Sequence, residues 1–354
     1  MTSLDQYGWQ AYRSSHPQPI EMNGLILGRI VSIKGFKYYA QTENGELETE
    51  LSGKLLYSAE NTELPKVGDW VSLMAYDTMG YIIDVLPRKN ALARRNPGAP
   101  TQKQILATNI DAAVIVQGLD REFNIMRLER YLVQLTACGI ASIVVLNKAD
   151  LVTDPAAYVD AVEKLQRPCT VQVCSTYTGM GLDALRQNLL QPGRTYVMIG
   201  SSGVGKSSLL NALMTSVTQA IGSTSEANKK GRHTTTTRDL FRLPQDSLLI
   251  DTPGMREFGL TGDEDAASDD LFPVIQRLAA QCRFNDCQHV DELGCAVIAA
   301  LQHGSLPSEV YDSYVKLKKE QRRFEIDAEE KKRLNKQFGK ITREAKNYRK
   351  KYKY

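Results

Sequence analysis

A chain of 354 residues is too long for one average domain, so we expect two or three, each with its own core. Hydrophobic residues make up 42% of the chain, and no apolar run approaches the roughly 20 residues that a membrane span needs. The first residues show no export signal. We therefore expect no membrane association and a cytoplasmic location.

The net charge of +3 hides an uneven distribution. Residues 316–354 hold 16 basic and six acidic side chains, a net charge of +10, which leaves −7 for the rest of the chain. Such a tail can be a solvated helix face or a disordered end without a binding role. Alternatively, it can be an arm that binds a polyanion. The sequence leaves both interpretations open.

Between residues 25 and 86, five short alternating segments are separated by Gly, Asn and Asp turns. Five short strands favour an OB-type β-barrel, a fold that often binds single-stranded nucleic acid. Four aromatic residues there either stack on bases or pack inside the barrel: Phe36, Tyr38, Tyr39 and Trp70. The expected strands are residues 25–33, 36–42, 46–55, 69–76 and 80–86.

Residues 87–104 contain five basic side chains and no acidic one, and we expect an exposed, basic connector. From residue 105 onward, Val/Ile-rich segments alternate with helical patterns, which is typical of a parallel sheet covered on both faces. Beyond residue 270 the chain reads as helical. The expected domains are residues 1–95, 96–265 and 266–354.

A phosphate-binding loop is predicted after the apolar segment 194–199. Its sequence, GSSGVGKS, matches G-x-x-x-x-G-K-[ST] and lies between a strand and an amphipathic helix, as that motif requires. Lys206 can reach the β- and γ-phosphates, and Ser207 can offer its hydroxyl to Mg²⁺. The residues expected to bind the phosphates are Gly200, Ser201, Ser202, Gly203, Val204, Gly205, Lys206, Ser207 and Ser208.

A guanine-recognition motif, NKAD, follows the apolar segment 141–146. Asp150 can accept hydrogen bonds from guanine N1–H and from the exocyclic amine, a pair of bonds that adenine cannot make. The backbone around Ser175 and Thr176, after another strand-like segment, is placed to meet guanine O6. We therefore expect GTP and GDP as ligands. The residues of the motif are Asn147, Lys148, Ala149 and Asp150.

The magnesium site should be completed by the DTPG sequence after residues 247–250. Asp251 would hold Mg²⁺ through water, and Gly254 would offer its N–H to the γ-phosphate. Residues 223–239 are rich in Gly, Lys and Thr and read as a mobile switch loop. One threonine of residues 234–237 would complete the magnesium shell; Thr235 is our candidate, although the sequence does not decide among the four.

Along the chain, two base-recognition segments come first, followed by the phosphate loop, the switch loop and the magnesium-binding aspartate, whereas an ordinary GTPase begins with the phosphate loop. In a doubly wound sheet, all ligand loops follow the carboxyl ends of strands, so joining the old termini and opening the chain elsewhere preserves the site. The sequence therefore predicts a circularly permuted P-loop GTPase domain within an α/β fold.

Four metal-ligating side chains lie within fourteen residues: Cys282, Cys287, His289 and Cys295. Three thiolates and one imidazole at this spacing fit a closed, tetrahedral, structural zinc site, and a reducing compartment makes disulfides unfavourable. We expect one Zn²⁺ per chain in a helical C-terminal domain. The other cysteines, Cys138, Cys169 and Cys174, are scattered, and we interpret them as buried structural thiols.

The segments GSSGVGKSS, GRHTTT, DTPGMRE and CRFNDCQHVDELGCAV, with the permuted order and the N-terminal barrel, resemble the RsgA family of ribosome small subunit-dependent GTPases. This resemblance covers essentially the whole chain. It implies late assembly of the bacterial small ribosomal subunit, GTP hydrolysis stimulated by that subunit, and zinc on the four clustered ligands. Two departures are Leu293, where the family often has proline, and Ser175-Thr176 in place of the commoner Ser-Ala.

Our leading hypothesis is an enzyme that couples GTP hydrolysis to release from ribosomal RNA, with barrel, connector and tail contacting the phosphate backbone. A second is a binding module in which GTP only holds a docking conformation and hydrolysis is incidental. Under either hypothesis we expect a monomer. A third, a P-loop kinase, leaves NKAD unexplained.

The catalytic machinery is the least determined part of the sequence. Met255 stands where many GTPases carry a water-orienting glutamine, and a thioether cannot orient water by a strong hydrogen bond. His233 is our candidate for that role beside Lys206, although an exposed histidine without a catalytic role fits its loop equally well.

Overall fold

The computed structural model describes residues 3–18, 22, 24–58, 62–76, 79–96, 99–215, 238–251, 272–308, 310–315 and 318–319. By its internal contacts the chain divides into two units, residues 1–94 with 104–267, and residues 95–103 with 268–354. The first unit contains the barrel and the parallel sheet, and the second contains the cysteine–histidine cluster.

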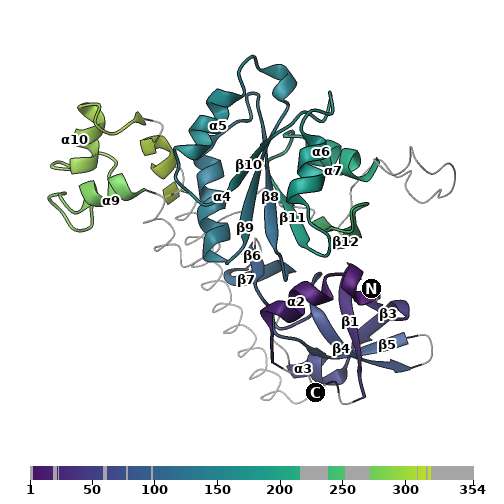
Figure 1. Ribbon diagram of the computed structural model, residues 1–354. Helices are drawn as coiled ribbons and strands as arrows, with labels where there is room; N and C mark the ends of the chain where they lie inside the picture. Colours follow the sequence, from purple (N-terminus) through teal and green to yellow (C-terminus); the bar gives the residue numbers. More distant parts are fainter. Residues whose placement is uncertain are drawn as a thin grey trace, which may run out of the picture. The chain divides into compact units, whose positions relative to one another are not determined.

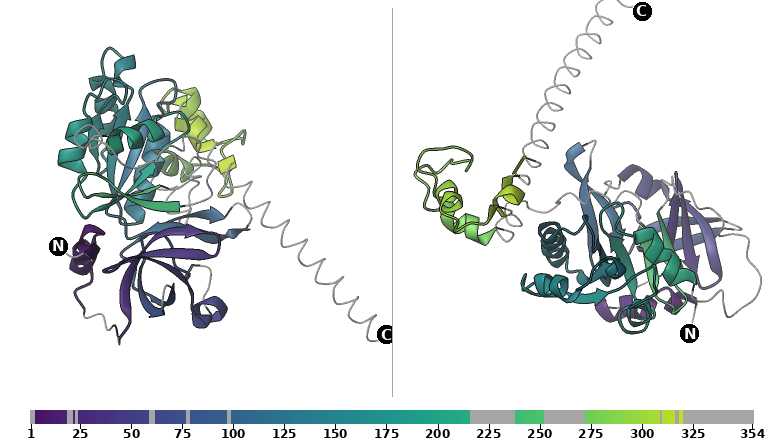
Figure 2. Two further views of the ribbon diagram at one scale, coloured as in Figure 1. Left: turned by 90° about the vertical axis from the view of Figure 1, so that its right-hand side faces the viewer. Right: turned by 90° about the horizontal axis from the view of Figure 1, so that it is seen from above.

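Five strands close into the predicted barrel, in the order β1-β2-β3-β5-β4 with β4 paired back to β1 (Figures 1 and 2). Trp70 and Tyr38 are buried, in agreement with the packing alternative, whereas Phe36 is 97% exposed. The expected strand 46–55 is partly wrong, because helix α3 (Gly53–Ser58) begins within it. The strands are β1 (Ile26–Lys34), β2 (Lys37–Thr42), β3 (Gly45–Leu51), β4 (Trp70–Tyr76) and β5 (Met79–Val85).

Two short helices, α1 (Ser3–Gln6) and α2 (Trp9–Ser15), precede the barrel. Leu4 and Tyr12 form a buried cluster with Trp70 of the barrel, and the Tyr12 hydroxyl donates to the Pro87 carbonyl at 2.7 Å. The polar N-terminal sequence therefore carries apolar anchors that pack against the barrel (Figures 1 and 2).

The expectation that residues 87–104 form an exposed connector is wrong, because this segment contains regular, partly buried structure. Strands β6 (Ala91–Asn96) and β7 (Ala99–Thr108) form a separate two-stranded sheet, in which Leu92 and Leu106 are buried. The connector's Arg88 guanidinium donates to both carboxylate oxygens of the buried Asp69, at 2.7 and 2.8 Å. Part of the connector's positive charge is therefore neutralised by a buried carboxylate of the same chain.

A parallel sheet follows, as the apolar segments predict, with the strand order β10-β9-β8-β11-β13 and the antiparallel β12 beside β13. Helices α4 (Ile125–Ala137) and α5 (Ala156–Glu163) cover one face, and α6 (Leu182–Ala184) and α7 (Lys206–Thr215) the other (Figure 1). The strands are β8 (Ala112–Gly118), β9 (Ala141–Asn147), β10 (Thr170–Val173), β11 (Thr195–Ile199), β12 (Arg238–Arg242) and β13 (Leu248–Asp251).

The barrel and the parallel sheet are joined by strand pairing and by one buried side chain. Strand β1 pairs antiparallel with β12, and the Ser32 hydroxyl donates to the Asp239 carboxylate. The guanidinium of Arg29, also on β1, is fully buried and donates to Thr195 Oγ1 of β11 at 2.8 Å and to the Gly68 carbonyl at 3.3 Å. Burial lowers the pKa of Arg29 to about 10.

Asp111 lies at the start of β8 and accepts from the Thr195 N–H at 2.8 Å, from Lys89 Nζ at 2.9 Å and from Arg194 Nη1 at 3.0 Å. Burial alone would raise the pKa of Asp111, but these donors outweigh it and hold the pKa below the ordinary value of 3.8. The stabilisation from this carboxylate is therefore complete above pH 3.8 and is lost as the pH falls through the lower, folded-state pKa.

We expect Asp111→Asn to lower the free energy of unfolding by about 1–3 kcal/mol at pH 7, because the amide cannot satisfy three donors. Denaturant unfolding at pH 7 and at pH 3 measures this effect. The difference between wild type and variant should shrink at the lower pH. A difference that is the same at both pH values would contradict the charge-based account.

In the second unit, α9 (Pro273–Ala279) and α10 (Ala296–Gln302) flank the cysteine–histidine cluster. Phe272 and Tyr314 are buried and meet edge to face, with ring centroids 5.4 Å apart. Among the described residues, no helix is long and apolar enough to cross a membrane.

Candidate functional site

Five parallel strands, β8, β9, β10, β11 and β13, end at the same edge of the sheet. Ligand sites of doubly wound sheets lie outside the carboxyl ends of the strands. The expected phosphate loop follows β11, the expected base loop follows β9, and β13 ends at Asp251. The fold therefore brings the predicted motifs to one edge despite their order in the chain.

The phosphate loop connects β11 to α7, which begins at Lys206. The Lys206 ammonium donates to the carbonyls of Gly200 at 2.6 Å and Ser201 at 2.5 Å, so it lies over the loop. Gly205 has a φ of +96°, and a Cβ there would lie 2.2 Å from Asn147 Nδ2. Only glycine fits, because the base loop packs directly on the phosphate loop.

Asn147 is fully buried and connects three segments. Its Nδ2 donates to the Val204 carbonyl of the phosphate loop at 3.0 Å. Its Oδ1 accepts from the Thr176 N–H at 3.1 Å and from the Cys174 thiol at 3.7 Å. The motif's asparagine therefore orders the loops around the site.

Lys148 makes a second connection between the same loops. Its backbone is left-handed, with a φ of +66°, and its ammonium donates to the Gly203 carbonyl and to Asp120 Oδ2, both at 2.6 Å. Our sequence analysis missed Asp120. The available signal was an acidic residue two positions beyond the end of a buried strand, at the edge where the ligand loops meet.

Asp150 is exposed at the edge of the sheet where the ligand loops meet. The Ser175 hydroxyl donates to Asp150 Oδ1, and Ser175 Oγ accepts from the N–H groups of Tyr177 at 3.2 Å and Thr178 at 3.1 Å. We expected only the backbone at Ser175 to contribute. Its side chain also orients the aspartate.

The remaining predicted residues divide into two groups. Ala149 is buried within the NKAD motif, and Asp251 ends β13. Ser202, Ser207 and Ser208 are exposed at the phosphate loop and the first turn of α7. The other group lies outside the described residues and comprises His233, Thr235, Gly254 and Met255.

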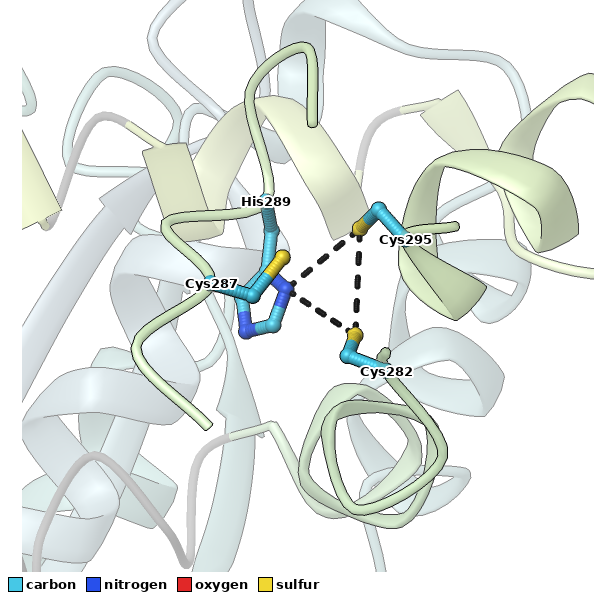
Figure 3. Close-up of side chains that lie close together, drawn as sticks. All are labelled: Cys282, Cys287, His289 and Cys295. Atoms are coloured by element: carbon cyan, nitrogen blue, oxygen red, sulfur yellow. Dashed lines mark hydrogen bonds between the residues drawn. The ribbon is translucent and has the colours of Figure 1, made fainter. Parts of the chain in front are cut away.

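The second unit brings the four predicted metal ligands together, with their ligand atoms within 4.8 Å of one another (Figure 3). His289 Nδ1 lies 3.5 Å from the sulfurs of both Cys282 and Cys295, and these two sulfurs are 3.9 Å apart. Tetrahedral ligands at ordinary metal–S and metal–N bond lengths would be separated by about 3.6 Å (S to N) and about 3.8 Å (S to S). Cys282, His289 and Cys295 therefore fit three corners of one tetrahedral metal site, and the Cys287 sulfur lies within 4.8 Å of their ligand atoms.

Neighbouring groups support metal binding. Burial lowers the pKa of His289, which favours the neutral imidazole that can ligate a metal. Burial raises the pKa of Cys282, but hydrogen bonds from the Ala296 and Val297 N–H groups and with the thiols of Cys295 and Cys287 together leave it below the ordinary value. Hydrogen bonds also hold the loop that carries His289. The Tyr311 hydroxyl donates to the His289 carbonyl at 2.8 Å and supports the left-handed backbone of His289.

The Glu292 carboxylate accepts from the N–H groups of Gln288 and Val290, at 2.8 and 2.9 Å, on either side of His289.

Comparison with known proteins agrees with this geometry. The RsgA GTPase family model matches residues 85–261. An ABC transporter model matches residues 187–344, a range that contains the phosphate loop but not the guanine motif. Small ribosomal subunit biogenesis GTPase RsgA 1 of Bacteroides thetaiotaomicron is 38% identical over 97% of both chains, and RsgA 2 of Lactiplantibacillus plantarum is 44% identical over 84% of both.

Solved structures give the same result. YjeQ of Thermotoga maritima is 28% identical, with a TM-score of 0.54 over 83% of this chain and 97% of that one. YloQ, a circularly permuted GTPase, is 25% identical, with a TM-score of 0.52 over 86% of this chain and 98% of that one. The chain therefore belongs to the RsgA GTPase family and is a circularly permuted GTPase.

Proposed function

We propose that the described edge of the sheet binds GTP with Mg²⁺ and that the protein hydrolyses GTP to GDP and phosphate there. The observation that carries the proposal is the pair of bonds between base loop and phosphate loop, from Asn147 Nδ2 to the Val204 carbonyl and from Lys148 Nζ to the Gly203 carbonyl. These bonds hold a guanine-reading carboxylate and a phosphate cradle in one site.

In this proposal the chain's own groups divide the nucleotide among them. Asp150 accepts from the guanine N1–H and amine, and Lys206 exchanges its loop carbonyls for the β- and γ-phosphate oxygens. Ser207 and Asp251 would hold Mg²⁺, which supplies charge neutralisation at the phosphates, with Thr235 as a third contact. Gly254 would donate its N–H to the γ-phosphate.

Slow intrinsic hydrolysis follows from Met255, which cannot orient water by a strong hydrogen bond. We propose that His233 orients the attacking water in the complex with a partner. A neutral imidazole can accept the water proton near neutral pH.

We expect His233→Ala to lower the partner-stimulated rate of GTP hydrolysis by about 100-fold, the usual contribution of a general base, and the basal rate far less. Single-turnover hydrolysis with and without small ribosomal subunits measures both rates. Full stimulation in this variant would exclude His233 from the role and indicate a group supplied by the partner.

The metal in the cluster of the second unit is, in our proposal, one structural Zn²⁺. Three thiolates and one imidazole are the ligands that zinc prefers in closed sites. The four protein ligands leave no open position for a reacting water. The ion would therefore stabilise the fold of residues 272–308 and take no part in hydrolysis.

We propose that the partner is the small ribosomal subunit, with its rRNA, during late maturation, since the relatives carry that subunit in their names. Residues 316–354, with a net charge of +10, suit contact with an RNA backbone. The barrel is less suited to that role, because residues 24–86 hold nine acidic and five basic side chains. We propose that the protein acts as a monomer in the cytoplasm.

The pairing of β1 with β12 offers a route from partner to active site. Strand β12 begins at Arg238, directly after the threonines of residues 234–237. A partner that moves the barrel strand would therefore act on the chain beside the proposed magnesium ligand. This connection supports stimulation of hydrolysis through the barrel.

Sedimentation with small subunits in GTP, a non-hydrolysable GTP analogue or GDP tests this function. We expect co-sedimentation with the analogue, release with GDP, and a binding constant that falls steeply with salt concentration. Removing the residues after Phe324 should flatten the salt dependence, because each neutralised phosphate contributes to its slope. Equal co-sedimentation in all nucleotide states would contradict the proposal.

A further inference from the structure

We propose that Asp120 is a positioning residue of the guanine nucleotide site, whose carboxylate holds the Lys148 ammonium against the phosphate loop. The inference deepens the proposed function, since it rests on nucleotide binding at this edge of the sheet. Asp120 would not touch the nucleotide. It would fix the spacing between the loop that reads the base and the loop that binds the phosphates.

The topology gives Asp120 this position. Strand β8 lies between β9, which leads to the base loop, and β11, which leads to the phosphate loop. Asp120 is the second residue after β8, so it emerges between the two ligand loops. The Leu119 N–H donates to the Asn147 carbonyl at 2.7 Å and ties this turn to the base loop.

The contacts around Asp120 hold its carboxylate in one orientation. Asp120 Oδ1 accepts from the Glu122 N–H at 3.0 Å, which leaves Oδ2 for the Lys148 ammonium at 2.6 Å. The same ammonium donates to the Gly203 carbonyl at 2.6 Å. A Cβ at Gly118 would lie 2.9 Å from Asp120 Oδ1 and 3.5 Å from Lys148 Cδ, so the glycine leaves room for the pair.

The charges agree with the geometry. The side chains of Lys148 and Asp120 are 26% and 23% exposed, so solvent screens their attraction only in part. Partial burial would raise the pKa of Asp120, but the bonds from Lys148 and Glu122 outweigh it and lower the pKa. The carboxylate is thus ionised at neutral pH. Its negative charge, close to a phosphate site, is compensated by Lys148.

Asp120→Asn removes the negative charge but keeps the turn at residues 120–122. Asparagine retains an oxygen that accepts from the Glu122 N–H, but its amide group faces the Lys148 ammonium. We expect fluorescent GDP to dissociate about tenfold faster, the loss of one charge-assisted hydrogen bond. The KM for GTP should rise by a similar factor and more than kcat changes. Asp120→Glu, which restores the charge, should recover part of the affinity.

Asp183→Asn is the matched control, since Asp183 is 81% exposed and forms an ion pair of the same length, 2.6 Å, with Arg186. Arg186 contacts the Ala212 carbonyl near the end of α7, the opposite end of that helix from the phosphate loop. This control should dissociate GDP at the wild-type rate. Lys148→Met should weaken binding, and adding Asp120→Asn to it should have little further effect.

Unchanged GDP dissociation in Asp120→Asn, equal acceleration in Asp183→Asn, or fully additive effects of the Asp120 and Lys148 changes would each overturn the assignment. These results differ from a failure of the proposed function, in which the wild type itself would bind no guanine nucleotide.

Discussion

Asp150→Asn should change the base preference of the protein from guanine to xanthine. The carboxylate can accept from both the N1–H and the amine of guanine, whereas an amide offers one acceptor and one donor. The Ser175 hydroxyl can still donate to the remaining oxygen, so the side chain keeps its orientation. We expect GTP affinity to fall about 100-fold, or about 3 kcal/mol, and the affinity for xanthosine triphosphate to rise.

Competition between the two nucleotides for a fluorescent GDP analogue measures this change. Asp154→Asn is a matched control, because Asp154 lies four residues further on and its Oδ1 accepts from the Ala156 N–H at the start of α5. It should keep the wild-type preference. An unchanged guanine preference in Asp150→Asn would show that another group reads the base.

Cys287→Ala should release the metal and unfold the region around the cluster. Three ligands hold zinc far less tightly than four, and in a structural site the binding energy is folding energy. We expect about one zinc per wild-type chain, purified without added metal, and much less than one in the variant. Elemental analysis measures the metal, and limited proteolysis between residues 272 and 308 reports the loss of structure.

Cys138→Ala is the control, because Cys138 lies in the first unit, at the end of α4, and is not among the four clustered ligands. It should keep the metal and the wild-type proteolysis pattern. Wild-type protein without stoichiometric metal would rule out the structural zinc, and a stably bound metal in Cys287→Ala would remove Cys287 from the ligand set.

Much of the architecture could be predicted because it depends on local patterns. Asn124 caps α4 through its side chain, which accepts from the Arg127 N–H, and Leu128, Leu132 and Leu135 follow at helical spacing. The Val/Ile runs indicated β8 and β9 for the same kind of reason. The permuted order of the motifs required only that parallel strands end at one edge.

The features that the sequence analysis missed depend on tertiary partners. Nothing near Arg88 in the sequence shows that its charge is taken up by Asp69, so the segment read as an exposed connector. Arg29 sits in an ordinary strand pattern, and its burial depends on acceptors at Gly68 and Thr195. The contact of Asp120 with Lys148 likewise joins residues 28 positions apart.

The most direct test of the account is the rate of GTP hydrolysis with and without purified small ribosomal subunits, with large subunits as the control. We predict slow hydrolysis by the protein alone, a large acceleration by small subunits, and none by large subunits. GTP-dependent binding to small subunits without acceleration would contradict the account and would identify the protein as a binding module in which hydrolysis is incidental.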